Sequence, residues 1–321
     1  MPMDDVETLL FPEISPYAIH DISTTAPHRL RVEESGNAQG IPIVFLHGGP
    51  GSHCKAYHRC FFNPLYYRII LFDQRGSGTA QPQGELRHNN TSELIQDLEK
   101  IREYLGISQW VLFGGSWGST LALLYAQDYP HRVLGLILRG IFLARQQDID
   151  WVYRPTALLE FFPQQWQDFT AWLPKAARQD PLPYYYHCLT GDDIALAQQA
   201  ALQWSAWGAC VVSFGTFLPP NEFEPELLMA AKIESHYMMN RCFLQENQIL
   251  RNMESLQSIP SMIIHGQQDL ICPLNGAWQL HQSWKNSTFH CLPNSGHLAH
   301  YPEMQRALIT ATETMAQQLF L

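Results

Sequence analysis

The feature that most constrains this chain is the run Gly-Gly-Ser-Trp-Gly at residues 114–118, which follows three apolar residues and precedes a helical pattern. A strand that turns abruptly into a helix around G-x-S-x-G forms a nucleophile elbow, which lifts the serine hydroxyl out of the fold. The glycines on either side leave room for the turn, since a Cβ would clash there. The helix expected over residues 120–129 points its positive end at a developing oxyanion. The pattern therefore predicts Ser116 as a nucleophile; the alternative is a turn that carries a surface serine.

Composition and charge narrow the class of protein. The chain has 321 residues, of which 46% are hydrophobic and 16% charged, so it is long enough for a large packed core with an insertion. Its net charge of −10 argues against nucleic acid or an anionic membrane as a partner. Residues 1–13 lack the pattern of a signal peptide, and no apolar run approaches the roughly 20 residues of a membrane span. We therefore expect a cytoplasmic protein.

The cysteines support the same compartment. Seven are scattered along the chain, an odd number with no C-x-x-C pair. Such spacing argues against a disulfide framework and against a structural zinc site. We expect no metal and no cofactor.

Strands alternate with helices over much of the chain. Besides the elbow strand, strands are expected at residues 41–47, 68–73, 133–139, 261–266 and 288–292, and helices at 91–105, 120–129 and 303–319. This alternation predicts an α/β fold with a mostly parallel sheet and helices on both faces. Such a sheet binds ligands at the carboxyl ends of its strands, where Ser116 also lies.

The chain changes character between residues 144 and 256. This stretch is rich in Trp, Tyr, Phe and Pro and has helical rather than strand patterns. We interpret it as a helical cap inserted into a catalytic domain formed by residues 1–143 and 257–321.

A serine nucleophile needs a histidine base and an acid that orients it. In the elbow fold these follow the serine in the order acid, then histidine. Asp269 comes one loop after the strand at 261–266, and His297 one loop after the strand at 288–292. His300 is a rival, but it stands where the last helix should begin. Asp73 also ends a strand, yet it precedes Ser116, so we expect it to organise its own loop.

Two backbone N–H groups should face the oxyanion. The residue after the nucleophile, Trp117, supplies one, and the loop after the strand at 41–47 supplies the other, best assigned to Gly49. The alternative for residues 48–51 is a simple tight turn.

Several motifs together resemble a known family. His-Gly-Gly-Pro-Gly at 47–51, Asp-Gln-Arg-Gly-Ser-Gly at 73–78 and Gly-Gly-Ser-Trp-Gly-Ser-Thr-Leu at 114–121 are similar to the prolyl aminopeptidases, also called proline iminopeptidases. Segments 138–142 and 233–237 extend the resemblance. It implies an α/β-hydrolase fold with an inserted helical cap, and a serine peptidase that removes N-terminal proline from small peptides without a metal.

The resemblance also implies roles in substrate binding. Glu234 matches one of two cap glutamates that bind the substrate amine, Phe142 would wall the proline pocket, and Arg139 would order the acidic side chains. Tyr153 matches the tyrosine of a Trp-aromatic-Tyr segment of the family, in which this chain has Val152 at the middle position, and it is a further candidate for substrate binding. Cys272, three residues after Asp269, either lines the pocket or is simply buried.

One departure falls on the amine site. The family's second glutamate follows Trp-x-x-Trp, and this chain has Gly208 there. Gln267 and Gln268 also replace the family's Arg-Tyr before the acid. Three functions are therefore weighed: a prolyl aminopeptidase, a capped hydrolase of small esters or amides that needs no free amine, and a ligand-binding protein on an inactive hydrolase fold. The intact triad pattern disfavours the third. Peptide length and oligomeric state stay open.

Overall fold

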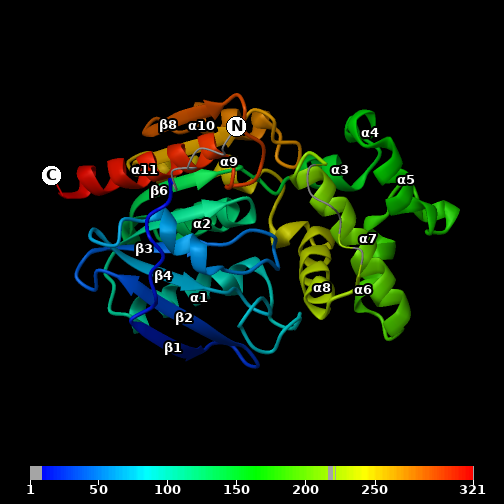
Figure 1. Ribbon diagram of the computed structural model, residues 1–321, viewed down its shortest axis with the longest axis horizontal. Helices are drawn as coiled ribbons and strands as arrows, with labels where there is room; N and C mark the ends of the chain where they lie inside the picture. The colour runs from blue at the N-terminus through cyan, green and yellow to red at the C-terminus, as the bar shows by residue number, and fades with distance from the viewer. Residues whose placement is uncertain (1–8, 216–219, 221, 321) are drawn as a thin grey trace, which may run out of the picture.

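The computed structural model describes residues 9–215, 220 and 222–320, and its centre is an eight-stranded sheet (Figure 1). The strand order is β1-β2-β4-β3-β5-β6-β7-β8, with antiparallel pairing at β1–β2 and β2–β4 and parallel pairing elsewhere. The strands are β1 (Ala18–Ser23), β2 (Arg29–Gly36), β3 (Ile41–Leu46), β4 (Tyr67–Phe72), β5 (Trp110–Gly115), β6 (Val133–Arg139), β7 (Ser261–Gly266) and β8 (Ser287–Leu292).

The predicted mostly parallel sheet is confirmed. All six expected strands form. Two of them, β5 and β7, are buried at every residue. Such runs need to be apolar throughout because helices cover both faces. Strands β1 and β2 were not expected, since charged residues interrupt them. They form because β2 alternates buried and exposed side chains and pairs with β4.

Helices cover both faces of the sheet. Val44 and Leu46 of β3 belong to a core that includes α1 (Thr91–Tyr104), α2 (Trp117–Asp128) and α10 (Leu274–Gln282). Ile43 and Phe45 point to the opposite face, where they join a core built on α11 (Pro302–Phe320) and the short helix η1 (Ala56–Phe61). This two-residue alternation is the ordinary consequence of the pleated strand.

Helix α2 begins earlier than predicted. It starts at Trp117, directly after the elbow serine, and not at Thr120. Gly118 lowers the helix propensity of the first turn, which hid the true start in the sequence. The structure needs glycine there, because a Cβ on Gly118 would lie 2.0 Å from the carbonyl oxygen of Leu46 in β3.

The chain between β6 and β7 is helical, and helices α3 to α8 gather at one end of the sheet (Figure 1). They are α3 (Gln146–Tyr153), α4 (Leu158–Phe161), α5 (Pro163–Ala171), η3 (Lys175–Ala177), α6 (Leu182–Thr190), α7 (Ile194–Val212) and α8 (Pro225–Met239), followed by η4 (Arg241–Phe243), α9 (Gln248–Arg251) and η5 (Met253–Leu256). The remaining short helix is η2 (Pro130–Arg132). Among the described residues, no helix combines the length and apolarity that a bilayer crossing requires.

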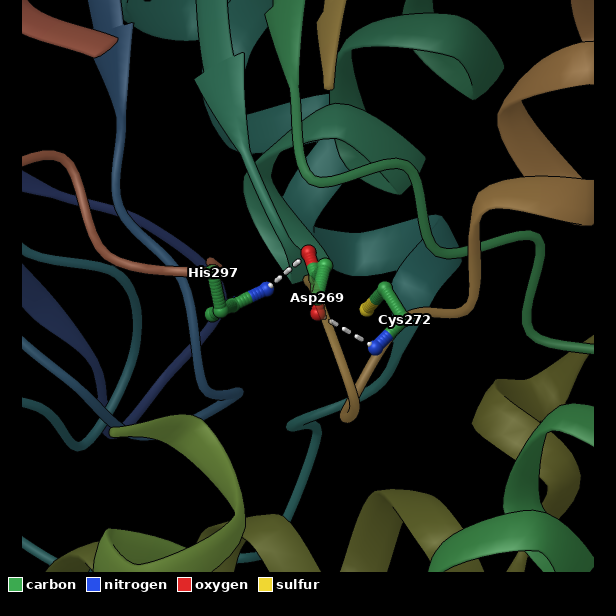
Figure 2. A group of neighbouring side chains, drawn as sticks. All are labelled: Asp269, Cys272 and His297. Atoms are coloured by element: carbon green, nitrogen blue, oxygen red, sulfur yellow. Dashed lines mark hydrogen bonds and ion pairs between the residues drawn. The ribbon is translucent and has the colours of Figure 1, made fainter. Parts of the chain in front are cut away.

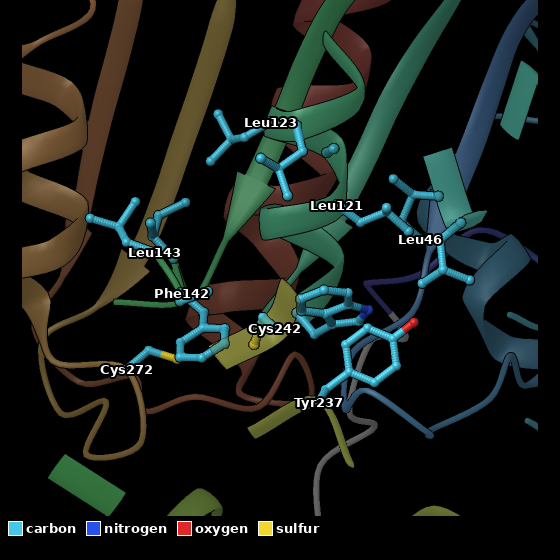
Figure 3. Packing of buried hydrophobic residues seen from close by; sticks show 14 of the residues in the cluster. Leu46, Leu121, Leu123, Phe142, Leu143, Tyr237, Cys242 and Cys272 are labelled. Carbon is cyan, nitrogen blue, oxygen red and sulfur yellow. The ribbon is translucent and has the colours of Figure 1, made fainter. Parts of the chain in front are cut away.

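Helix α8 is fixed firmly on the sheet domain. The Tyr237 hydroxyl donates to Asn89 Oδ1 at 2.9 Å, and its ring meets Trp117 with centroids 5.0 Å apart. Figure 3 shows Tyr237 and Cys242 in one packed cluster with Phe142 and Leu121, so a single apolar core continues from the sheet into the inserted helices. A Cβ on Gly51 would lie 2.8 Å from the Ala230 carbonyl, so α8 rests on the loop after β3.

Two glycine-to-alanine changes should have opposite effects on stability. Gly118→Ala forces a Cβ against the Leu46 carbonyl and is expected to lower the free energy of unfolding by about 3 kcal/mol. Gly208→Ala in α7 has no atom within 4 Å of the new Cβ and should raise it by roughly 0.5–1 kcal/mol. Chemical denaturation of both variants checks this. Equal effects would show that the approach of α2 to β3 is not a tight constraint.

Candidate active site

The elbow holds Ser116 in a conformation that few side chains adopt. Its φ is +58° and its ψ −128°, and it caps helix α2 at the end of β5. The turn is possible because its neighbours lack side chains: a Cβ on Gly114 would lie 2.3 Å from the Gly118 carbonyl oxygen. Such strain persists only where the surrounding structure enforces it. The result is a serine presented at the carboxyl end of the sheet.

Asp269 and His297 are brought together from two different loops. Asp269 follows β7, His297 follows β8, and the distance from His297 Nδ1 to Asp269 Oδ2 is 2.7 Å (Figure 2). The other carboxylate oxygen accepts the backbone N–H groups of Ile271 at 3.1 Å and Cys272 at 2.8 Å. These two amides fix the carboxylate, which in turn fixes the plane of the imidazole.

The charge state of this pair suits proton transfer. Burial tends to raise the pKa of Asp269, but the attraction and hydrogen bond of His297 lower it below its ordinary value. The carboxylate is therefore ionised at neutral pH and orders the ring with Nδ1 protonated. That tautomer leaves Nε2 free to accept a proton.

Ser116 and His297 line the same cavity. Between these two described residues the structure has no hydrogen bond, and the serine hydroxyl lies next to the Cys272 thiol. Catalytic hydrogen bonds are often long without substrate and tighten when it binds. His300, the rival of His297, is exposed and stacks on Tyr301 outside the cavity.

The end of β6 supports His297 from behind. Arg139 Nη1 donates to the backbone carbonyl of His297 at 2.7 Å. A Cβ on Gly140, whose φ is +52°, would lie 3.0 Å from His297 Cε1. The resemblance assigned Arg139 to the acidic side chains, whereas among the described residues it forms no ion pair. Its contact is with the main chain of the histidine.

The loop after β3 is ordered by a histidine and a glutamine. Gln74 donates its backbone N–H to His47 Nε2 and its side-chain N–H to the His47 carbonyl, both at 2.9 Å. Its Oε1 accepts the indole N–H of Trp117 at 2.8 Å. This network ties the loop that carries Gly49 to the first residue of α2. As the first helical residue, Trp117 has an amide N–H with no acceptor inside the helix.

Asp73 organises the neighbouring loop. Its carboxylate accepts the backbone N–H of Cys54 at 2.6 Å and both the N–H and hydroxyl of Thr79 at 2.8 Å. This matches the expectation that Asp73 serves its loop and not the base.

Two cavities meet at Ser116, and Gly49, Glu234 and Ile271 also line both. The first, which we call the Phe142 cavity, is a hollow of about 340 Å³ that is partly open to solvent. Its walls are mainly apolar, with Asp148, which pairs with Arg145, as a second carboxylate beside Glu234. Its walls include Phe142, Ile149, Val152, Tyr153, Met238 and Cys272. The second, the Arg139 cavity, is a hollow of about 1000 Å³ that is partly open to solvent. It is also lined by Gly115, His297, Lys55, Tyr57 and His58.

Glu234 of α8 faces the serine from the inserted helices. Its carboxylate accepts the Tyr153 hydroxyl at 3.1 Å and the Trp204 indole N–H at 2.7 Å. The two aromatic rings stack with centroids 4.6 Å apart. Burial raises the pKa of Glu234, and the two hydrogen bonds oppose that rise. Among the described residues no cation pairs with this carboxylate, so it is ready for a cationic ligand.

Asp269, Cys272 and His297 also form a group that could hold a metal ion, with ligand atoms within 4.8 Å of one another. Their hydrogen bonds already account for the arrangement (Figure 2). Burial, with the nearby Asp269 charge, raises the pKa of Cys272 well above its ordinary value, which keeps the thiol protonated. Metals bind the thiolate, so this sulfur is a poor ligand, as well as a poor nucleophile.

Two residues of the site escaped the sequence analysis. Trp204 was given no role from the sequence, but its indole N–H donates to Glu234. His265 accepts the Ile141 N–H at 3.2 Å and donates to the Cys272 carbonyl at 2.8 Å, which ties the Asp269 loop to the end of β6. Burial lowers its pKa, which favours the neutral ring that this pattern needs. A histidine inside an apolar strand was the one available signal.

Comparisons with known proteins agree with this geometry. A family model described as the alpha/beta hydrolase fold matches residues 41–182. The chain is 42% identical to the proline iminopeptidase of Xylella fastidiosa over an alignment of 309 residues. That alignment covers 95% of this chain and 98% of the Xylella protein. It is 39% identical over 315 residues to the proline iminopeptidase of Arabidopsis thaliana, and this alignment covers 95% of this chain and 82% of the Arabidopsis protein.

Solved structures show the same fold at low identity. VinJ matches with a TM-score of 0.58 and 19% identity over 94% of this chain and 99% of its own. The esterase RhEst1 from Rhodococcus sp. matches with a TM-score of 0.54 and 18% identity, over 94% of this chain and 99% of its own. The predicted α/β-hydrolase fold is therefore confirmed.

A fluorophosphonate probe should label this protein at Ser116, with complete loss in Ser116→Ala. Asp269→Asn removes the charge that orders His297, so its labelling rate should fall by about three orders of magnitude. His300→Asn is the matched control and should label as the wild type does. Mass spectrometry of the labelled peptide gives the site. Labelling that survives Ser116→Ala, or that depends on His300, would contradict this assignment.

Proposed function

Because this chain belongs to the proline iminopeptidase family of α/β-hydrolases, we propose that it is a serine aminopeptidase that releases N-terminal proline from small peptides. Ser116 is the nucleophile, His297 the base and Asp269 the residue that orients it. One observation carries the substrate assignment: Glu234, a carboxylate with two neutral donors and no cationic partner among the described residues, lines both cavities beside Ser116.

The triad divides the hydrolysis into two steps. His297 Nε2 takes the hydroxyl proton as Ser116 Oγ attacks the prolyl carbonyl, and then gives that proton to the leaving nitrogen. A water, activated by the same ring, attacks the acyl-enzyme and frees proline. The N–H groups of Gly49 and Trp117 stabilise the oxyanion in both steps. The His47–Gln74 network supports this role, since it ties both groups into one frame.

The apolar walls of the Phe142 cavity suit a pyrrolidine ring, and Glu234 suits its protonated nitrogen. Phe142 and Cys272 contribute to the wall, and Tyr153 holds Glu234. A charge-assisted hydrogen bond to a buried group contributes about 1.5–3 kcal/mol. Glu234 thus limits the enzyme to substrates with a free amine, which separates it from a general hydrolase of esters or amides.

Gly208 occupies a revealing position on α7. Trp204 stands one helical turn before it and holds Glu234, and Val212 stands one turn after it and lines the Arg139 cavity. Gly208 therefore lies on the face of α7 that is turned to the site, with nothing within 4 Å of its missing Cβ. We propose that this chain recognises the substrate amine with one carboxylate instead of the two of the family pattern.

We further propose that residues 144–256 act as a cap over a catalytic domain of residues 1–143 and 257–321. The contribution of α8 to the site supports this division. All seven cysteines are free, which supports a reducing compartment such as the cytoplasm.

The free amine should decide which substrates are cleaved. Proline amide should be hydrolysed at least tenfold more efficiently than the same amide acetylated on its imino nitrogen, because only the first pairs with Glu234. Glu234→Gln keeps the shape and removes the charge, so it should lower kcat/KM selectively for the unblocked amide by ten- to a hundredfold. Equal rates for the two amides would favour the general hydrolase instead.

Gly208→Glu should restore the second carboxylate. The side chain has space at this position, so we expect a lower KM for proline amide, by up to about tenfold. Gly208→Gln is the matched control, since it adds the same volume without charge. A gain of equal size in both variants, or in neither, would show that α7 does not present position 208 to the amine.

A further inference from the structure

Arg139 is a cation without a carboxylate partner. Of its five guanidinium N–H groups, one donates to the His297 carbonyl, and among the described residues no other hydrogen bond or ion pair involves the guanidinium. The guanidinium is packed against the backbone: a Cβ on Gly115 would lie 2.7 Å from both Cζ and Nε of Arg139. Gly115 directly precedes Ser116, so this charge lies beside the residue that comes before the proposed nucleophile.

Such an arrangement is costly unless something offsets it. Burial lowers the pKa of Arg139, and the charge of Asp269 opposes that fall. Asp269, however, is already occupied by His297 and lies beyond ion-pair distance of the guanidinium. A desolvated charge is normally paired, because leaving it alone costs several kcal/mol. Arg139 lines the Arg139 cavity, so a ligand there can meet its remaining N–H groups.

The charges of that cavity favour an anion on the side away from Glu234. Among the described residues that line it, Lys55 and Arg139 are the lysine and the arginine, and Glu234 is the one carboxylate. His58 is neutral, because burial and the nearby Arg139 lower its pKa to about 3. Once a substrate amine has paired with Glu234, both cations lack an anion. The substrate itself can supply one.

We propose that Arg139 binds the C-terminal carboxylate of a dipeptide substrate, so that the enzyme reads both ends of Pro-Xaa. This inference rests on the proposed function and names its preferred substrate class. The planar guanidinium matches a carboxylate with two parallel hydrogen bonds. Glu234 then holds the proline nitrogen and Arg139 the opposite end, with Ser116 between them.

The chemistry of the step is unchanged by this contact. The bond between Ser116 Oγ and the prolyl carbon forms, and the bond to the nitrogen of the second residue breaks. His297 delivers the proton to that nitrogen, and the amino acid leaves with its carboxylate still charged. In a dipeptide a single Cα separates the leaving nitrogen from the carboxylate, so these two groups lie within about 4 Å of each other. An additional residue would move the carboxylate away from Arg139.

The test compares three substrates with the wild-type, full-length enzyme. Release of proline is measured from Pro-Ala, from Pro-Ala amide and from Pro-Ala-Ala. We expect kcat/KM for Pro-Ala to exceed that for each of the other two by about tenfold or more, as for one charge-assisted contact. Equal values for the acid and its amide would overturn the proposal without any variant.

Variants assign the effect to Arg139. Arg139→Gln should bring the ratio of kcat/KM for Pro-Ala to kcat/KM for Pro-Ala amide close to one. Arg139→Lys should keep part of the preference for Pro-Ala. If Arg139 only holds His297 in place, Arg139→Gln would lower kcat/KM equally for both substrates and leave their ratio unchanged. Lys55→Gln, which removes the exposed cation of the same cavity, is the control and should change the ratio less than Arg139→Gln does.

Proline amide separates this proposal from the proposed function, because it carries no carboxylate. If the wild type cleaves proline amide but shows no preference for Pro-Ala over its amide, the carboxylate site is wrong and the aminopeptidase assignment stands. If proline amide is not cleaved, the proposed function itself fails.

Discussion

The close approach of helix α2 to strands β3 and β5 is the constraint on which the rest of the site depends. Glycine is required at Gly114 and Gly118 because carbonyl oxygens occupy the space of any Cβ. That contact forces Ser116 into a positive φ and places the Trp117 amide at the free end of the helix. It also sets the Gly48–Gly49 loop against the serine, where a Cβ on Gly48 would lie 3.3 Å from Ser116 Cβ. The positions of the proposed nucleophile and of the proposed oxyanion donors thus depend on one packing contact.

Around this rigid centre, charges divide the site into two halves. The Phe142 cavity is mainly apolar and has two carboxylates in its wall, Glu234 and Asp148, of which Asp148 is paired with Arg145. The Arg139 cavity, which Glu234 also lines, is bordered by two cations. Neither Glu234 nor Arg139 forms an ion pair with another described residue, so each can pair with substrate instead of protein. The glycine at position 208 removes a second negative charge of the family pattern and shifts the balance of the site toward the cations. We infer that this balance selects short zwitterionic peptides.

The sequence predicted the parts of the site that depend on local patterns. Ser116 directly follows β5, Asp269 and His297 each follow a strand by one short loop, and the ends of parallel strands bring all three to one edge of the sheet. Contacts between residues far apart in the chain could not be predicted from the sequence. The resemblance linked Arg139 to acidic side chains, whereas its hydrogen bond is to the His297 carbonyl. Trp204 was given no role, yet it donates to Glu234. Their partners lie 158 and 30 residues away in the chain, and no spacing or periodicity encodes such a pairing.

The most direct measurement of the central claim is a crystal structure with the boronic acid analogue of proline, whose tetrahedral adduct imitates the intermediate. The account predicts a bond from boron to Ser116 Oγ, one boron oxygen at the N–H groups of Gly49 and Trp117, and the ring nitrogen within hydrogen-bonding distance of the Glu234 carboxylate. A boron atom bound elsewhere, or a ring nitrogen turned away from Glu234 in a well-occupied adduct, would contradict it.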